Sequence, residues 1–170
     1  MSKTAQLGLP LVQAAQAQKH VSVNEALLRL DGRVTLVLHS ETLPVPPGVV
    51  IDGAAYAVPV GAVNAWSGKE GQIAIGTNGG WDFALPVRGW RAFIVDQGAG
   101  AIFDGAAWRA GFVTLSAHNA GLSLRVAEID HVIAAGPVST TGFVIPANAV
   151  VIGVTGRVTA GSLMDVPWYA

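Results

Sequence analysis

The densest group of titratable side chains in the sequence is formed by Glu128, Asp130 and His131. On a β-strand, residues two apart face the same side, so the two carboxylates would share one face and His131 would point to the other. Paired carboxylates about 5–9 Å apart are the catalytic groups of many glycosidases. A solvated polar strand face explains the same residues more simply. We therefore assign no catalytic residue and expect that the protein is not an enzyme.

Other patterns for catalysis or metal binding are missing from the sequence. The chain has no cysteine, which excludes disulfides, thiolate zinc sites and cysteine nucleophiles. It also lacks the common phosphate-binding, zinc-protease and serine-hydrolase signatures. The four histidines are scattered, and none stands four residues from another: His20, His39, His118 and His131. We expect no bound metal and no cofactor.

Aromatic rings offer a second kind of chemistry, because a flat ring can stack on the C–H face of a sugar. Five aromatic residues in the middle of the chain could do this: Tyr56, Trp66, Trp81, Trp90 and Trp108. The alternative is that they fill a thin β core, since each tryptophan can bury about 150–250 Å². We expect this set to contain a carbohydrate-binding surface. Trp66 is the first choice, because its polar and glycine neighbours are typical of a loop.

The strongest helical pattern lies in residues 1–40. Ser22 and Glu25 are spaced as a capping box, which predicts the start of a helix there. Apolar residues then recur at steps of four and three and would form one stripe on a helix of about 16 residues: Val23, Leu27, Leu30, Val34 and Val37. This pattern is too short for a clear coiled coil, so we expect a helix packed on a neighbour, preceded by an extended arm.

Residues 44–111 read as a small antiparallel β-hairpin module. Three turn dipeptides begin 26 residues apart, twice over, and each is followed by an aromatic residue: Asp52-Gly53, Asn78-Gly79 and Asp104-Gly105. Asp-Gly and Asn-Gly suit hairpin turns because both residues tolerate positive φ. The recurrence at one spacing predicts repeated hairpin units.

Residues 112–170 are expected to begin a β-sandwich or jelly-roll-like domain. The strands predicted there are Phe112–Leu115, Leu122–Ile133, Gly142–Ile145 and Val150–Val158. We expect another strand to start at Asp165, just before the chain stops, so that either a partner chain completes this region or the natural protein continues. The expected fold class is mainly β, with a short N-terminal helix.

Composition limits the partners that the chain can have. It is 51% apolar and only 12% charged, with a formal net charge of −1, so no general attraction to nucleic acid or anionic lipid is expected. No apolar run is long enough to span a membrane, and the N-terminus is a poor signal peptide, so we expect synthesis in a cytoplasm. With so few charges, a monomer would expose large apolar patches, which favours a homo-oligomer.

The chain resembles a domain of unknown function found in alphaproteobacterial phages, prophages and gene transfer agents. The most specific part is residues 16–27, QAQKHVSVNEAL, followed by Leu30-Asp31. The pattern continues with Asp52-Gly53, Tyr56, Trp66-Ser67-Gly68, Gly80-Trp81, Gly89-Trp90, Asp104-Gly105, Trp108, Ile145-Pro146 and Val151–Val158. The resemblance implies a protein of virion fibres or spikes and supplies no catalytic residues.

From this resemblance we expect a structural head-spike or tail-fibre protein on the virion surface that attaches to host polysaccharide. Residues 1–40, through the stripe of apolar residues, would bind other virion proteins or further copies, and a trimer is favoured by analogy with many fibres. A capsule-polysaccharide depolymerase of the same particles and a pure connector without a ligand are the alternatives.

Overall fold

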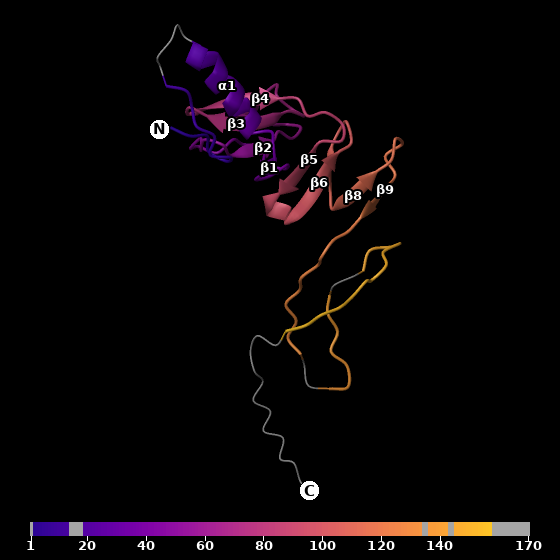
Figure 1. Cartoon of the computed structure of the whole chain (residues 1–170). Coiled ribbons are helices and arrows are strands. Elements are labelled where there is room, and N and C mark those ends of the chain that lie inside the picture. Colours follow the sequence, from indigo (N-terminus) through magenta and orange to yellow (C-terminus); the bar gives the residue numbers. More distant parts are fainter. Residues whose placement is uncertain (1, 14–18, 134–135, 143–144, 158–170) are drawn as a thin grey trace. The chain divides into compact units, whose positions relative to one another are not determined.

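The computed structural model describes residues 2–13, 19–133, 136–142 and 145–157 (Figure 1). The chain forms two units, Met1–Val126 and Ala127–Ala170, which are described separately below. One helix and nine strands lie in the first unit: α1 (Lys19–Asp31), β1 (Val37–Leu38), β2 (Ala55–Ala57), β3 (Ile73–Thr77), β4 (Gly80–Ala84), β5 (Arg91–Ile94), β6 (Ala99–Phe103), β7 (Trp108–Ala110), β8 (Phe112–Leu115) and β9 (Gly121–Ser123). Two short 3-10 helices, η1 (Asn64–Trp66) and η2 (Val95–Gln97), complete the set.

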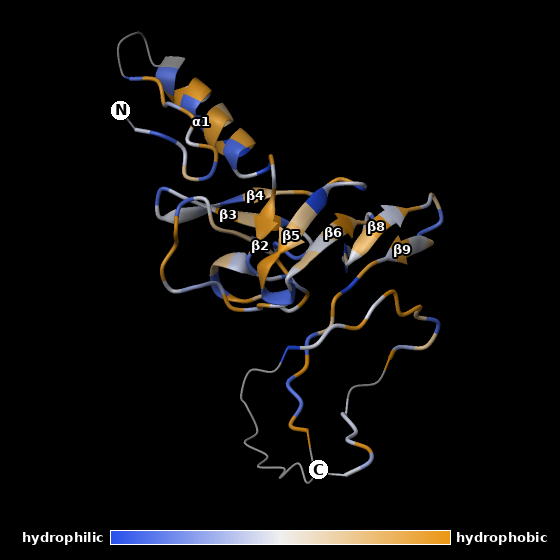
Figure 2. Ribbon diagram, turned by 60° about the horizontal axis from the view of Figure 1, so that its bottom comes forward, coloured by the Kyte–Doolittle hydropathy of each residue, from blue (hydrophilic) through white to orange (hydrophobic). Residues whose placement is uncertain are grey.

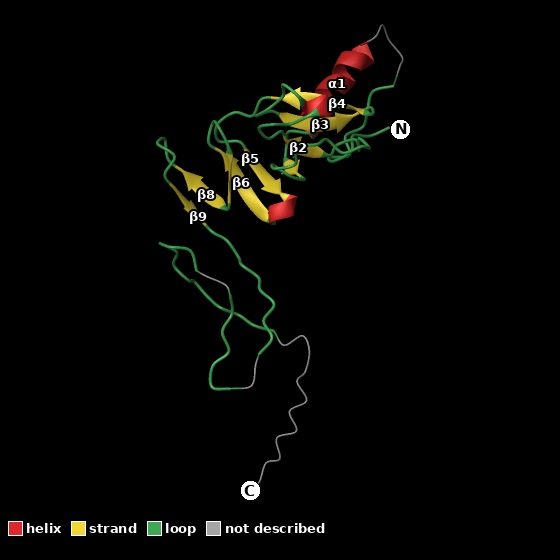
Figure 3. Ribbon diagram, turned by 180° about the vertical axis from the view of Figure 1, so that it is seen from behind, coloured by secondary structure: helices red, strands yellow, loops and turns green. Residues whose placement is uncertain are grey.

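Seven strands form one mixed sheet in the order β4-β3-β2-β1-β5-β6-β7 (Figure 3). Two antiparallel meanders, β2-β3-β4 and β5-β6-β7, flank β1, which pairs in parallel with both β2 and β5. Strands β8 and β9 form a separate antiparallel pair. The expected mainly β class with a short N-terminal helix is thus confirmed.

Two of the three predicted turns connect neighbouring antiparallel strands. Asn78 and Gly79 join β3 to β4 with φ of 49° and 73°, the two positive values that a type I′ hairpin turn requires. Asp104 opens the loop between β6 and β7. The prediction of a hairpin at Asp52-Gly53 was wrong, because the strand before this turn is β1, which is parallel to β2. A parallel pair needs a long crossover, and this turn lies at its end.

The helix begins and ends earlier than its apolar pattern indicates. It starts at Lys19, so Ser22 lies inside it and the predicted capping box is wrong. It ends at Asp31, and therefore Val34 and Val37 do not continue the stripe; Val37 is instead the first residue of β1. Residues 14–18 of the expected arm lie outside the described residues. The preceding residues turn back on themselves, with hydrogen bonds from Thr4 N to Leu9 O and from Leu11 N to Ser2 O, both 2.9 Å.

The two faces of the sheet carry different cores. One face holds the larger cluster, which includes Leu38, Ile73, Ile94 and Phe103. Over β2 to β4, the opposite face holds a smaller cluster in which Trp66 and Val58 pack on Ala74. Residues 58–71 lead through η1 across this second face. We refer below to the face that carries Trp66 as the outer face.

The strand predictions for residues 112–158 hold only at the beginning. Phe112–Leu115 forms β8 as predicted. Of the predicted strand Leu122–Ile133, only Leu122 and Ser123 belong to a strand, β9. Residues 124–133, 142, 145 and 150–157 are described by the structure and form no strand. Residues 143–144 and 158 lie outside the described residues. Among the described residues, no helix is long and apolar enough to cross a bilayer.

Candidate binding surface

The N-terminal residues 2–12 form an arm that is fixed by two polar residues on α1. Asp31 is almost fully buried and accepts hydrogen bonds from Thr4 Oγ1 at 2.7 Å, Gln6 N at 2.9 Å and Leu7 N at 2.6 Å. Asn24, seven residues earlier, exchanges two hydrogen bonds with the backbone of Val12. Positions seven apart lie on the same side of a helix, so one face of α1 binds both ends of the arm.

The Asp31 carboxyl group is held in its charged form by these contacts. Burial raises the pKa of this carboxyl group. The hydrogen bonds from Thr4 and from the backbone N–H groups of the arm lower it by a larger amount, so the net pKa is below the ordinary value. The arm therefore binds to a carboxylate.

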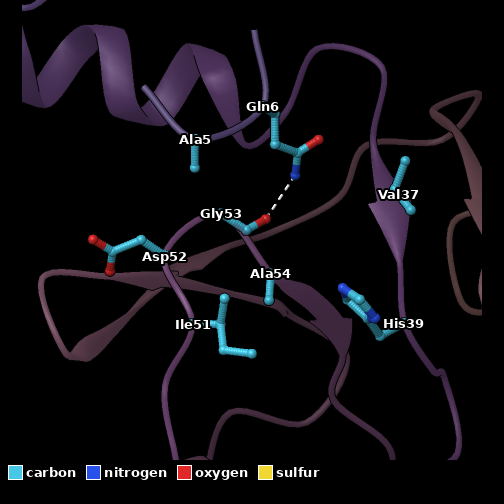
Figure 4. Close-up of a pocket in the computed structure, with 8 residues that line it drawn as sticks. All are labelled: Ala5, Gln6, Val37, His39, Ile51, Asp52, Gly53 and Ala54. Atoms are coloured by element: carbon cyan, nitrogen blue, oxygen red, sulfur yellow. Dashed lines mark hydrogen bonds between the residues drawn. The ribbon is translucent and has the colours of Figure 1, made fainter. Parts of the chain in front are cut away.

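The arm forms one wall of a pocket of about 290 Å³ on the outer face (Figure 4). Its lining residues come from the arm, β1 and the turn before β2: Ala5, Gln6, Val37, His39, Ile51, Asp52, Gly53 and Ala54. The Gln6 side chain donates to Gly53 O at 2.6 Å. Gly53 has φ of +84°, and a Cβ there would collide with Ala5, so glycine lets the arm approach the sheet.

His39 connects this pocket with a cluster of aromatic rings. Its imidazole stacks on Tyr56 with ring centroids 5.3 Å apart and an interplanar angle of 27°. Tyr56 contacts Trp66 and Trp81, and these two indoles meet edge to face at 5.2 Å. Phe83 extends the cluster, with Lys69 Nζ 5.3 Å from its ring centroid. Aromatic pairs at these distances stabilise the outer face beyond simple burial.

The structure corrects the sequence's first choice of a ligand-binding ring. Trp66 has an exposed fraction of 0%, because residues 58–71 fold over the sheet and bring η1 against Ala74. A stacking platform needs a ring face in contact with solvent, so Trp66 is a core residue. Trp108 is also buried, packed on Phe103.

The remaining predicted rings are Tyr56, Trp81 and Trp90, and each is half-buried. Trp90 lies on the other face of the sheet, against the larger core cluster, whereas Tyr56 and Trp81 share the outer face. A carbohydrate-binding role for these three residues stays a prediction.

Phe93 is the aromatic residue that the sequence reading missed. Among the phenylalanines, tyrosines and tryptophans that the structure describes, it alone is classed as exposed, at 46%. It pairs with Val37 across β1 and β5, so it lies on the outer face beside the pocket. The signal was present in the alternation Arg91-Ala92-Phe93-Ile94, in which Phe93 has the same parity as the charged Arg91.

Asp104 is a buried acidic residue with a structural role. Asp104 is buried and accepts from the backbone N–H groups of Ala106 and Ala107 and from Arg109 Nε, at 2.8, 2.8 and 2.6 Å. The Ala107 N–H is the largest cause that lowers the pKa of Asp104 to about 2. Such a strong acid at a hairpin turn is a structural ion.

The three residues proposed first as an acid–base group lie in the second unit. Glu128, Asp130 and His131 are all exposed, on backbone without a strand, and His131 Nε2 lies 2.8 Å from Ser139 Oγ. Within the described ranges, no three His, Asp or Glu side chains are close enough to hold a metal ion.

The apolar stripe predicted for attachment is divided between two elements. Val23 and Leu30 lie on α1 and are 44% and 49% exposed, and Leu27 between them is half-buried. Val34 follows the helix and is 43% exposed, whereas Val37 lines the pocket. Attachment through these residues is not tested by the structure and stays a prediction.

Comparison with protein families finds one match, described as a protein of unknown function (DUF2793), over residues 23–109. This range starts in α1 and ends in β7, so it covers the seven-stranded sheet and the aromatic cluster on its outer face. It stops before β8 and β9 and does not include the resemblance noted at residues 145–158. No curated protein matches the chain.

Proposed function

The chain belongs to the DUF2793 family, whose description assigns no activity, and we propose that it is a structural subunit of a phage or gene transfer agent particle. In this proposal several copies assemble into a head spike or tail fibre that attaches to host surface polysaccharide. The family match itself is neutral on this point. The support comes from the resemblance in the N-terminal sequence and from the physical character of the second unit.

The observation that carries the proposal is the exposure of apolar side chains in residues 127–157. Val132, Val150, Ile152 and Val154 are 90%, 87%, 83% and 87% exposed. In Figure 2, orange marks the hydrophobic residues of the chain. Soluble monomers rarely expose large amounts of apolar surface, and where it occurs it often marks a contact with another molecule. These side chains therefore need a partner chain to cover them.

The spacing of these residues favours further copies of the same chain. Val150, Val151, Ile152 and Val154 form an almost continuous run of β-branched apolar residues, which is typical of a β-strand. Strand formation in this segment would be completed between chains, where the backbone N–H and C=O groups find partners. Interchain β-sheets of this kind suit fibres, in which one subunit occurs in a small symmetric ring.

The first unit supplies two further surfaces for such a subunit. Val23 and Leu30 on α1 would contact other virion proteins, as the sequence reading expects. The half-buried rings Tyr56 and Trp81 on the outer face would contribute to polysaccharide binding. Repetition of a weak site on each copy raises the effective affinity by roughly 10²–10⁴ without any new contact.

Sedimentation of the full chain tests the assembly directly. We expect an oligomer, with a trimer favoured, that dissociates in the variant Ile152→Asp because a carboxylate would enter the covered apolar surface. Val60→Asp is the matched control, since Val60 is 93% exposed in the first unit. A monomeric wild-type chain, or an oligomer that is unchanged by Ile152→Asp, would contradict the proposal.

Adsorption of the full chain to host cells separates the proposal from its alternatives. Adsorption that competes with purified surface polysaccharide supports attachment. Release of reducing sugar ends from that polysaccharide would instead identify a depolymerase, and Glu128→Gln would then abolish the release. An oligomer that neither adsorbs nor cleaves would be a pure connector.

A further inference from the structure

Phe93 occupies an unusual place for an exposed aromatic ring. Strand β5 is an interior strand of the sheet, between β1 and β6, and Phe93 points to the outer face near the middle of this strand. Its strand neighbours Ala92 and Ile94 belong to the larger core on the opposite face, whereas Phe93 belongs to neither core cluster. The ring therefore lies outside both clusters and exposes 46% of its surface.

The space beside this ring is open. Gly100 is the cross-strand partner of Phe93 on β6, so the position where its side chain would stand lies next to the ring on the same face. A Cβ placed on Gly100 would meet no atom within 4 Å. Phe93 is thus bordered on β6 by the open space at Gly100, called the recess below, and on β1 by Val37.

Polar groups border the same surface at both ends. Arg91 shares the outer face with Phe93, is exposed, and donates a long hydrogen bond of 3.3 Å to Val113 O. His39 follows β1, is exposed, and lines the pocket of about 290 Å³ together with Val37. The surface thus has an apolar floor with hydrogen-bonding groups on two sides.

This combination matches the chemistry of a sugar ring. A hexopyranose has an apolar face of C–H groups, which stacks on an aromatic ring, and hydroxyl groups at its rim, which bond to guanidinium and imidazole groups. The pocket described above lies beside this surface and shares Val37 and His39 with it. The exposed aromatic ring, the open recess and the polar border are each present before any ligand binds.

We infer that Phe93, Gly100, Arg91 and His39 form a subsite for one hexopyranose unit of a polysaccharide. This inference rests on the proposed attachment to host polysaccharide and names the place where it occurs. In this inference Phe93, rather than a tryptophan, is the ring that stacks on the sugar. The polysaccharide would then contact the outer face of β1, β5 and β6.

Saturation-transfer NMR on the full chain tests the subsite. The probes are the methyl glycosides of glucose, galactose, mannose and N-acetylglucosamine and linear tetrasaccharides of the same units. We expect transfer to the ring protons of at least one probe and binding roughly tenfold weaker in Phe93→Ala, because the stacking contact is lost. Val95→Ala is the matched control, since Val95 is equally exposed at 46%, and it should bind as the wild type does.

A second variant fills the recess without removing the ring. Gly100→Leu should abolish transfer while leaving the melting temperature within a few degrees of the wild type, because its Cβ meets no atom within 4 Å. If Phe93→Ala fails to fold, Gly100→Leu decides. Transfer to no probe with the wild type, or undiminished transfer with either variant, would overturn the subsite.

Sedimentation of the same samples keeps this result separate from the assembly. An oligomer that transfers saturation to no sugar refutes the subsite and leaves the structural role intact. A monomer whose sugar binding depends on Phe93 supports the subsite and refutes the assembly.

Discussion

At the scale of single residues, the two buried carboxylates of the first unit accept hydrogen bonds from backbone N–H groups and so fix nearby segments of the chain. Asp31 binds the N-terminal arm, and Asp104 closes the loop between β6 and β7. Both have a pKa below the ordinary value, because hydrogen bonds to the charged form outweigh the effect of burial. Protonation of either carboxylate would weaken the hydrogen bonds that it accepts.

Acid should destabilise the protein through Asp104 in a defined range. Its pKa falls from 3.8 in the unfolded chain to about 2 in the folded protein, so its contribution is complete above pH 3.8 and is lost as the pH falls toward 2. We expect the free energy of unfolding of the wild type to decrease across this range more steeply than that of Asp104→Asn. Urea unfolding at pH 5, 4, 3 and 2 measures it; parallel curves for the two proteins would argue against the assignment.

A second test at this scale decides whether Trp66 is a core residue or a ring that stacks on a ligand. Trp66→Ala should lower the free energy of unfolding by about 3–5 kcal/mol, as expected for a large cavity. Trp66→Phe should cost much less, because the buried indole Nε1 has no hydrogen-bond partner to lose. Thermal and urea unfolding measure both. A Trp66→Ala variant as stable as the wild type would show that the ring is not part of the core.

At the scale of elements, α1 is fixed to its surroundings by polar contacts of its own residues and of Arg33 just after it. Asn24 and Asp31 bind the arm, and Arg33 Nη2 lies 3.6 Å from Asp82 Oδ2 on β4. The exposed Val23 and Leu30 show that apolar packing contributes less here than the sequence pattern indicates. The helix is therefore sensitive to single polar substitutions.

Loss of Asn24 should release the end of the arm. In Asn24→Ala, Val12 loses both hydrogen bonds to the side-chain amide, so its backbone N–H should exchange with solvent faster by about one order of magnitude. Ser22→Ala is the control on the same helix. If Ser22 were a helix cap, this control would cost about 1 kcal/mol; because it lies inside α1, we expect no measurable change. Hydrogen-exchange NMR and thermal unfolding report the two outcomes.

Arg88 fixes the β8–β9 hairpin to the loop after β6. Its guanidinium donates to Asp104 O, to Asn119 Oδ1 at 2.6 Å and to Ser116 O at 2.7 Å. A lysine cannot reach several acceptors in this planar arrangement. In this hairpin the Ala120 N–H donates to Ser116 Oγ at 3.0 Å. We expect Arg88→Lys to speed the exchange of this N–H while the β3–β4 amides stay protected. Equal protection of the Ala120 N–H in both proteins would contradict the role of the guanidinium.

At the scale of the whole molecule, the apolar surface of the second unit links stability to concentration. If copies cover Val150, Ile152 and Val154, the assembled state binds subunits and the unfolded state does not, so mass action stabilises the fold. We expect the melting temperature to rise by several degrees between about 1 and 100 μM protein. Calorimetry at a series of concentrations measures this, and a melting temperature independent of concentration would count against assembly through this surface.

Local features of this protein could be predicted where one or two residues determine the backbone. Asn78 and Gly79 both accept positive φ, which is sufficient for the hairpin between β3 and β4. The bounds of β8 and the mainly β class likewise follow from short apolar runs between turns. In these cases the favourable conformation depends on neighbours in the sequence.

The tertiary structure decided which residues face solvent. Trp66 stands among polar and glycine residues in the sequence and Phe93 among apolar ones, yet Trp66 is fully buried and Phe93 is 46% exposed. The difference arises because residues 58–71 cover β2 to β4 and leave β5 open, and because β1 pairs in parallel with two strands distant in the sequence. Burial depends on such long-range pairing, whereas composition and spacing report only the local preference.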